Sequence, residues 1–218
     1  MKHIKFNLCN LFVLFSFVLV YSSCDKLELQ KDYDYKGEAL DPHVDMTAWE
    51  FMNSRPDIFS IMKEAVEYAG MQEYYSQTDS LMTYLFINDT GMQTFINSRG
   101  GLVITHVDVE VVRKFLQYHI IRGEYHAYNK KLPVEPIYVK TMLKGEDGLL
   151  TIKVNKSSAN SVGSPIANGN IVVNESASNF KSKRISSVTS NILPVNGAIH
   201  VFSDYAYYRK DANYTPAF

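Results

Sequence analysis

Apolar residues in the first half of the chain recur mostly at the spacing of a helix. In two segments they lie at i, i+3, i+4 and i+7, so that they share one helix face. The first segment contains Ile58, Ile61, Met62, Ala65 and Ala69. The second contains Val112, Phe115, Leu116 and His119. Gly70 predicts the end of the first helix, and Asp108 is placed to cap the start of the second.

Three shorter helices are predicted from capping residues and local pattern. Thr47 and Glu50 form a capping box, in which each residue satisfies a backbone N–H of the other at the start of a helix. Asn88 or Asp89 can cap a second short helix that ends before a pair of glycines. A third helical stretch is expected within residues 71–79.

Strands are predicted from continuous or alternating apolar runs, and most of them lie in the second half. Residues 81–87 form one apolar run with aromatic and β-branched members, which indicates a buried strand. Asn196-Gly197 predicts a type I′ turn between two strands. Helices in the first half and antiparallel strands in the second indicate an α+β fold. The remaining predicted strands are 137–143, 149–154 and 170–175, with a polar loop at 156–170.

The N-terminal segment has the pattern of an export signal. Lys2 and Lys5 precede an apolar run at residues 8–21, which is short for a helix that spans a membrane. Small residues then precede Cys24, as at the lipid-attachment site of bacterial lipoproteins. We expect residues 1–23 to be a lipoprotein signal peptide and Cys24 to carry the lipid. The alternative is ordinary cleavage nearby, which leaves an unmodified thiol.

Composition and charge narrow the class of partner. The chain is 46% hydrophobic and 21% charged, as in a folded protein. Removing the two lysines of the signal from 22 basic residues leaves 20 against 23 acidic ones, a net charge of −3. Because no basic run is present, nucleic acid is not an expected partner. Residues 25–45 are charged and aperiodic, which is typical of a tether.

Two segments combine apolar residues with polar ones in a recognisable order. The first is TYLFINDTGM, residues 83–92, which begins with Thr83 and contains Asp89. The second is FLQYHIIRGEY, residues 115–125, which contains the pair Tyr118-His119.

A third segment, NGAIHVFSDYAYY, begins with Asn196-Gly197 and contains His200. Together the three segments resemble the motifs of the fasciclin, or FAS1, domain family, over roughly Asp57 to Tyr208. The third segment is the nearest to the family pattern, whereas the first is a loose copy in which isoleucine replaces the usual proline and glycine the usual alanine.

The resemblance implies a FAS1-like α+β fold, with an antiparallel β-sandwich or wedge and helices, mostly from the N-terminal half, packed around it. It also implies an extracellular or surface-attached protein that is not an enzyme and needs no cofactor. The expected organisation is a signal peptide (1–23), a tether with a short helix (24–55), a FAS1 domain (56–210) and a tail (211–218).

The histidines of the motifs are expected to be structural. His119 shares a helix face with apolar residues, so we expect a buried neutral ring that links two segments. A receptor contact through this region is a further hypothesis, and no nearby nucleophile supports catalysis. His200 is expected to be a packed strand residue. No metal site is expected, because a helix start at Asp108 accounts for the alternation of His106, Asp108 and Glu110.

The chain has 15 tyrosines, and two of them suggest a ligand contact. Tyr205 and Tyr207 would share one face of a strand, where their rings could stack on a sugar; alternatively they are strand formers with surface hydroxyls. The sequence predicts a non-enzymatic adhesion or ligand-binding lipoprotein at the outer membrane or cell surface. Its partner would be extracellular matrix, a surface protein or a glycan. The alternative is an accessory glycan-binding lipoprotein of an outer-membrane polysaccharide-uptake system.

Overall fold

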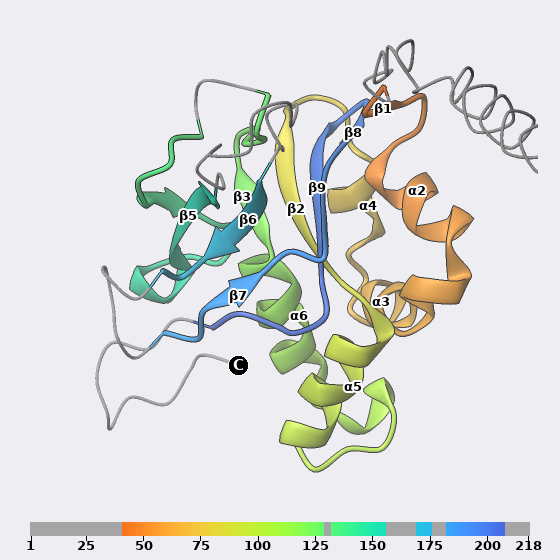
Figure 1. Ribbon diagram of the computed structural model, residues 1–218. Coiled ribbons are helices and arrows are strands. Elements are labelled where there is room, and N and C mark those ends of the chain that lie inside the picture. The colour runs from red at the N-terminus through yellow and green to blue at the C-terminus, as the bar shows by residue number, and fades with distance from the viewer. Residues whose placement is uncertain (1–40, 129–131, 156–168, 176–181, 208–218) are drawn as a thin grey trace, which may run out of the picture. The chain divides into compact units, whose positions relative to one another are not determined.

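A computed structural model describes residues 41–128, 132–155, 169–175 and 182–207 (Figure 1). The expected signal peptide, the lipidation site at Cys24, most of the tether, most of the polar loop and the C-terminal tail lie outside these residues. What the sequence predicts for these segments therefore stays a prediction. Among the helices described, none is long and apolar enough to cross a membrane.

Helices predominate in the first half of the described chain and strands in the second. The helical elements are α2 (Ala48–Ser54), α3 (Pro56–Tyr68), α4 (Gln72–Ser76), α5 (Asp89–Ser98), η1 (Ile104–His106), α6 (Val109–Tyr118) and η2 (Glu146–Gly148). The strands are β1 (His43–Val44), β2 (Met82–Ile87), β3 (Ile120–Arg122), β4 (Ile137–Lys140), β5 (Leu149–Asn155), β6 (Asn170–Val173), β7 (Ile185–Ser186), β8 (Thr189–Pro194) and β9 (Gly197–Phe202). The α+β prediction is confirmed.

The strands form two sheets, and the first joins both ends of the described chain. Its order is β1-β8-β9-β2-β3, and β2 runs parallel to β9, with Met82 opposite Gly197 and Ile87 opposite Phe202. The second sheet, β4-β5-β6-β7, is antiparallel throughout. In Figure 1, α2, α3 and α4 lie on one side of the first sheet and the second sheet lies on the other. The first sheet is therefore mixed, whereas the sequence predicted antiparallel pairing.

β2 shows why its sequence is apolar throughout. All residues from Thr83 to Ile87 are buried, because the strand lies inside the sheet and is covered on both faces. Rings of the helices and of β2 pack together on one face. Phe59 and Phe86 pack edge to face with their centroids 5.1 Å apart, and Tyr75 stacks on Tyr84 at 5.4 Å. The aromatic residues thus form the core between α3, α4 and the sheet.

The capping residues set the helix starts that the sequence predicts. The Thr47–Glu50 capping box is present at α2, Asn88 accepts a hydrogen bond from the N–H of Gly91 at α5, and Asp108 caps α6 through the N–H groups of Glu110 and Val111. These three local predictions are confirmed.

The folded unit includes residues that precede Pro56. β1 pairs in parallel with β8, so the residues around His43 and Val44 belong to the sheet and not to a tether. Ala48 and Met52 of α2 are fully buried in the core. The prediction of a tether up to residue 45 was wrong at its C-terminal end, because a two-residue strand has too little periodicity to be recognised from sequence.

The turn between β8 and β9 also differs from its prediction. The turn residues are Val195 and Asn196, and Asn196 is not among the described residues with positive φ. A type I′ turn centred on Asn196-Gly197 requires positive φ at both residues, so this prediction was wrong. Gly197 does have a φ of 145°, and it begins β9. The reason for the asparagine lies in its side chain, described below.

Candidate functional site

The three motif segments lie side by side in the first sheet. The first motif forms β2, the second forms the end of α6 and β3, and the third forms β9. The sheet places β2 between β9 and β3, so segments distant in sequence become neighbours. The side chains of these segments decide whether the region is a chemical site.

His119 lies at the end of α6 and is completely buried. Its Nε2 accepts a hydrogen bond from the N–H of Ala206 at 3.2 Å. Its Nδ1 therefore carries the ring proton and donates it to the carbonyl oxygen of Phe115, 2.7 Å away. The imidazole thus joins the last turn of α6 to the chain that follows β9.

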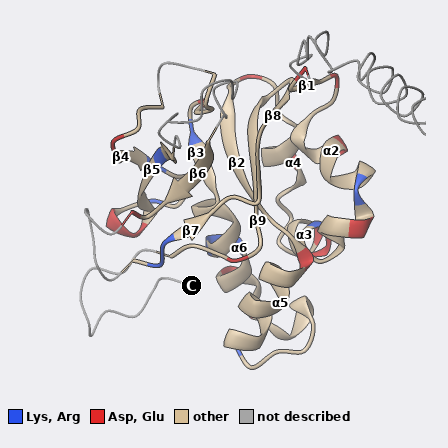
Figure 2. Ribbon diagram, in the orientation of Figure 1, with Lys and Arg blue, Asp and Glu red and all other residues tan. Residues whose placement is uncertain are grey.

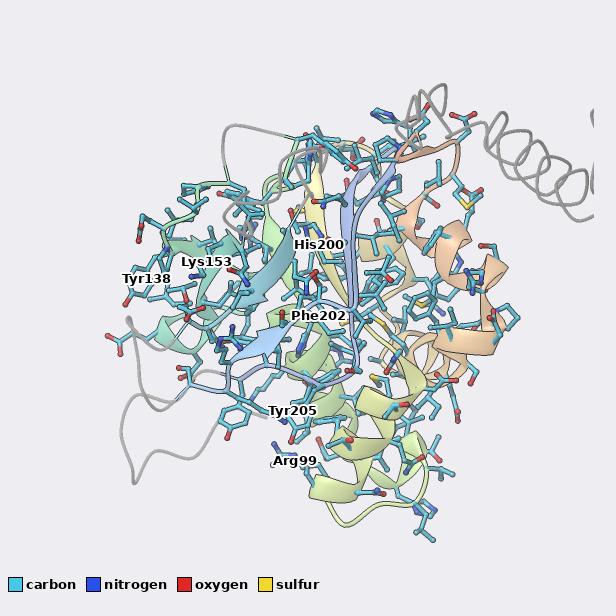
Figure 3. The ribbon with its side chains drawn as sticks, viewed as in Figure 1. Arg99, Tyr138, Lys153, His200, Phe202 and Tyr205 are labelled. Atoms are coloured by element: carbon cyan, nitrogen blue, oxygen red, sulfur yellow. The ribbon has the colours of Figure 1, made fainter. Side chains whose placement is uncertain are left out.

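His200, on β9, is held in the opposite tautomer. Its Nδ1 accepts from the N–H of Asn191 at 3.1 Å, and its Nε2 donates to the carbonyl oxygen of Tyr125 at 2.8 Å. The ring is fully buried, and Figure 3 shows it in the interior of the molecule. It links β9 to the irregular part of β8 and to the chain after β3.

The electrostatics of both rings favour the neutral form. Burial lowers the pKa of His119 from 6.5 to about 4, and the hydrogen bond to Phe115 opposes this only in part. Burial likewise lowers the pKa of His200 to about 4, and the nearby His126 adds to this effect. Since both nitrogens of each ring are bonded to backbone groups, neither ring is placed to act as a general base on a ligand.

The polar residues of the first motif also join elements. The Thr83 hydroxyl donates to the carbonyl oxygen of Gly123 and accepts from the N–H of Tyr125, both at 2.8 Å. Asp89 accepts from the hydroxyl of Ser60 at 2.6 Å and from the N–H of Ile61 at 2.9 Å. Thr83 therefore fixes the chain after β3, and Asp89 fixes α3 beside the start of α5.

Asn196 is the most connected residue of the third motif. Its Nδ2 shares its two protons among three acceptors, the carbonyl oxygens of Tyr75 and Gln77 and the hydroxyl of Tyr84, and its Oδ1 accepts from the N–H of Ala48 at 2.8 Å. The residue is fully buried. These contacts explain the asparagine before β9, because they join α2, α4 and β2 to the hairpin.

Asn174, which was not among the predicted structural residues, ties Tyr118 to the second sheet. Its Nδ2 donates to the Tyr118 hydroxyl at 3.1 Å and also lies within bonding distance of the carbonyl oxygens of Lys183 and Tyr207. Asn191 plays a similar part, since its Oδ1 accepts from the N–H of Ala127 at 2.7 Å. Both have positive φ, at 57° and 64°. Asparagine tolerates this conformation better than most residues, which is the one sequence signal that could have marked them.

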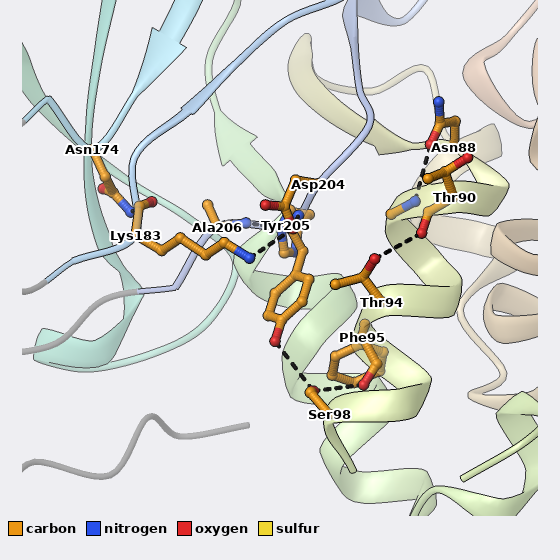
Figure 4. Close-up of polar contacts among 12 residues, drawn as sticks. Asn88, Thr90, Thr94, Phe95, Ser98, Asn174, Lys183, Asp204, Tyr205 and Ala206 are labelled. Carbon is orange, nitrogen blue, oxygen red and sulfur yellow. Dashed lines mark hydrogen bonds and ion pairs between the residues drawn. The ribbon is translucent and has the colours of Figure 1, made fainter. Parts of the chain in front are cut away.

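Tyr205 does not offer an exposed ring, which corrects the hypothesis of a stacking surface there. It is 7% exposed and packs edge-on against Phe95 and Phe115. Its hydroxyl donates to Ser98 at 3.1 Å, and the ammonium group of Lys183 lies 4.2 Å from the ring centroid (Figure 4). β9 ends before Tyr205, so Tyr205 and Tyr207 do not share a face of this strand as predicted. Tyr207 is half-buried, and a ligand contact through it stays a prediction.

The described residues contain no group of three or more histidine, cysteine, aspartate or glutamate side chains that could hold a metal ion. The hydroxyl of Tyr75 is buried and has no hydrogen-bond partner in this part of the chain. Burial raises the pKa of Tyr75 far above its usual range, so this phenol stays neutral. It lies in the aromatic core and not at a surface.

The comparisons with known proteins agree with the architecture. A solved structure of a FAS1 domain pair from the insect cell adhesion molecule fasciclin I is similar, with a TM-score of 0.52 and 16% sequence identity. The protein has a FAS1-like fold. The similarity covers 73% of this chain and 50% of that one, so the chain matches about half of the domain pair. No protein-family model matches the chain, and no curated protein matches its sequence.

Proposed function

We propose that this FAS1-like protein is a lipid-anchored, non-enzymatic module at the cell surface or outer membrane that acts in adhesion or binds an extracellular ligand. The observation that carries the proposal is the fold, which the chain shares with domains of a cell adhesion molecule.

The geometry of the motif residues supports a module that binds and does not catalyse. His119 and His200 are buried, neutral and bonded on both ring nitrogens to backbone groups. Thr83, Asp89 and Asn196 are likewise engaged with backbone or hydroxyl groups of neighbouring elements. The polar groups of the motifs therefore stabilise the sheet and its helices, which leaves the outer surface for recognition.

The anchor follows from the sequence before residue 25. An acyl group on Cys24 would hold the module at a membrane, and stable anchoring requires more than one acyl chain. The bacterial modification supplies several chains at one cysteine. The expected partner is extracellular matrix, a protein of another cell surface or a glycan.

An adhesion assay tests this proposal. Cells that display the wild-type chain are compared with cells that express Cys24→Ala, on surfaces coated with matrix proteins or with glycans. We expect the wild type to raise cell retention on at least one coating, and we expect the variant, released from the membrane, to lose that gain. Equal retention of both strains on all coatings would contradict a surface-anchored adhesin.

A further inference from the structure

A pocket beside the edge of the second sheet is lined by several cationic side chains. Within the part of the chain that the structure describes, these side chains form no ion pair. The pocket has a volume of about 510 Å³ and lies between the end of β3 and the hairpin that joins β4 to β5. Arg122, Lys140 and Lys144 line it, together with Glu146. The volume is within the range of small-ligand sites.

Most cations in the described part of the chain are paired with carboxylates. Six of its eleven lysines and arginines form ion pairs, namely Arg55, Lys63, Arg113, Lys153, Lys183 and Arg184. The five without an ion pair in these ranges are Arg99, Lys114, Arg122, Lys140 and Lys144. Three of these five line one pocket. Figure 2 shows the basic and acidic positions on the ribbon.

The hairpin that carries two of these cations is held in shape by its own hydrogen bonds. The N–H and the hydroxyl of Thr141 both donate to the carbonyl oxygen of Gly148, each at 2.9 Å. A Cβ on Gly148 would lie 1.8 Å from the carbonyl oxygen of Leu143, so the loop closes tightly at this glycine. Arg122 donates from Nε to the carbonyl oxygen of Thr141 at 3.3 Å, which orients its guanidinium group. The backbone that positions the cations is therefore held by hydrogen bonds and close packing.

The strand that carries Lys140 also carries an exposed aromatic ring. Tyr138 is two residues from Lys140 on β4, and successive side chains of a strand alternate between its faces, so the two residues share a face. Tyr138 is 61% exposed, and Figure 3 shows it at the outer edge of the molecule. Leu143 and Leu149 supply apolar walls to the pocket. Cations, an apolar wall and an exposed ring together suit a sugar that carries an acidic group.

We infer that this pocket binds the carboxylate or sulfate group of an acidic saccharide, with Tyr138 under the neighbouring sugar ring. The inference rests on the proposed function, for which it names a ligand class. A planar guanidinium with two ammonium groups favours an anion with several oxygens. Glu146 opposes the anion and so sets a limit on its affinity.

The test is isothermal titration calorimetry of the exported chain, carrying Cys24→Ala, at low ionic strength. The probes are a uronate tetrasaccharide, a sulfated tetrasaccharide, a neutral tetrasaccharide and a tetraglutamate peptide. The two acidic saccharides decide between carboxylate and sulfate as the preferred group. The neutral saccharide and the peptide separate the contributions of sugar and charge.

Matched variants locate the binding. We expect Lys140→Gln/Lys144→Gln to weaken binding of the preferred saccharide about tenfold, because two charge-assisted contacts are lost. We expect Arg99→Gln/Lys114→Gln, which removes the same charge from residues that do not line the pocket, to change it less than about twofold. Glu146→Gln is expected to tighten binding, and Tyr138→Ala to weaken it. Melting temperatures within about 2 °C of the parent show that the variants are folded.

Several results would overturn the inference. Equal loss in the two double variants would indicate general attraction to charge, and equal binding of tetraglutamate would show a site without preference for sugars. Failure of both acidic saccharides to bind would also overturn it. If the chain binds another extracellular ligand with unchanged affinity in Lys140→Gln/Lys144→Gln, the pocket inference fails and the proposed function stands. Turnover of any probe would contradict the proposed function itself.

Discussion

Among single residues, two buried histidines satisfy backbone hydrogen-bonding groups with opposite tautomers of the same side chain. His119 carries its ring proton on Nδ1 and accepts a hydrogen bond at Nε2, whereas His200 accepts at Nδ1 and donates from Nε2. In each case one donor and one acceptor of the backbone are satisfied inside the core, where an unsatisfied group costs about 1–3 kcal/mol. A neutral imidazole is suited to this task because it offers both functions at once.

Replacing His119 with alanine should mainly lower stability. The N–H of Ala206 and the carbonyl oxygen of Phe115 lose their ring partner, and a buried cavity remains. We expect the free energy of unfolding to fall by about 2–4 kcal/mol, measured by urea denaturation. The exposed His106→Ala is the control, with a change below about 0.5 kcal/mol. An unchanged melting temperature in His119→Ala with loss of ligand binding would show that the ring serves recognition.

The same rings predict a loss of stability in mild acid. Between pH 6.5 and about 4 the unfolded chain takes up protons on His119 and His200, whereas the folded chain does not. The stabilisation is therefore complete above pH 6.5 and declines as the pH falls toward 4, by at most about 3 kcal/mol for each ring.

Urea titrations at pH 7 and pH 5 check this, since most carboxylates stay ionised over that interval. The free energy of unfolding should be lower at pH 5, and His119→Gln should reduce the difference. Equal stability of the wild type at the two pH values would contradict the assignment of both histidines as buried and neutral.

At the scale of elements, the central three strands depend on close approach of β9 to the start of β2. A Cβ on Gly197 would lie 1.8 Å from the carbonyl oxygen of Met82 and 2.8 Å from its backbone N and C atoms. These are backbone atoms of a buried strand and cannot move aside as a flexible side chain would. The glycine therefore permits the parallel pairing that joins the two halves of the fold.

Gly197→Ala tests this contact. We expect it to lower the free energy of unfolding by about 3 kcal/mol, measured by thermal or urea denaturation. Gly70→Ala is the matched control, because Gly70 also has positive φ, at 64°, but nothing lies within 4 Å of the position that an added methyl group would take. The control should cost about 1 kcal/mol from backbone strain alone. Equal losses in the two variants would show that strain, and not the clash with β2, explains the glycine.

The elements that sequence patterns predict are those governed by local chemistry. The capping groups at α2, α5 and α6 and the buried strand β2 follow from residues within a few positions of each other. The parallel pairing of β2 with β9 and the strand role of His43–Val44 could not be predicted, because they depend on contacts between distant segments. The turn before Gly197 is not of the predicted type I′. The pair Asn-Gly does not by itself distinguish an asparagine that forms the turn from one whose side chain bonds distant elements.

The candidate site was predictable only in part for a related reason. Helical spacing placed His119 on a buried face, and the third motif marked His200. The buried asparagines at 174 and 191 have no periodic pattern, and the cations of the pocket come from two separate segments, the end of β3 and the β4–β5 hairpin. A surface cluster of this kind exists only after folding, so no local rule in the sequence indicates it.

At the scale of the whole molecule, a FAS1-like domain follows an expected lipid anchor. Cys24→Ala should move the protein from the membrane fraction to the soluble fraction and abolish incorporation of a labelled fatty acid. The reason is that the thiol is the expected attachment atom and that Cys24 is the one cysteine after residue 23. Metabolic labelling followed by fractionation measures both effects, with Ser23→Ala as a control that keeps the thiol. A wild-type chain without the label would show that the cysteine is not lipidated.

The proposed function requires that this protein binds an extracellular ligand and does not transform it. One screen decides between binding and turnover: the exported chain is incubated with matrix proteins and with neutral and acidic glycans, while bound ligand and any product are followed together by mass spectrometry. We predict saturable binding to at least one member of the panel, with the ligand recovered intact. Appearance of a product, or absence of binding across every class, would contradict the proposed function.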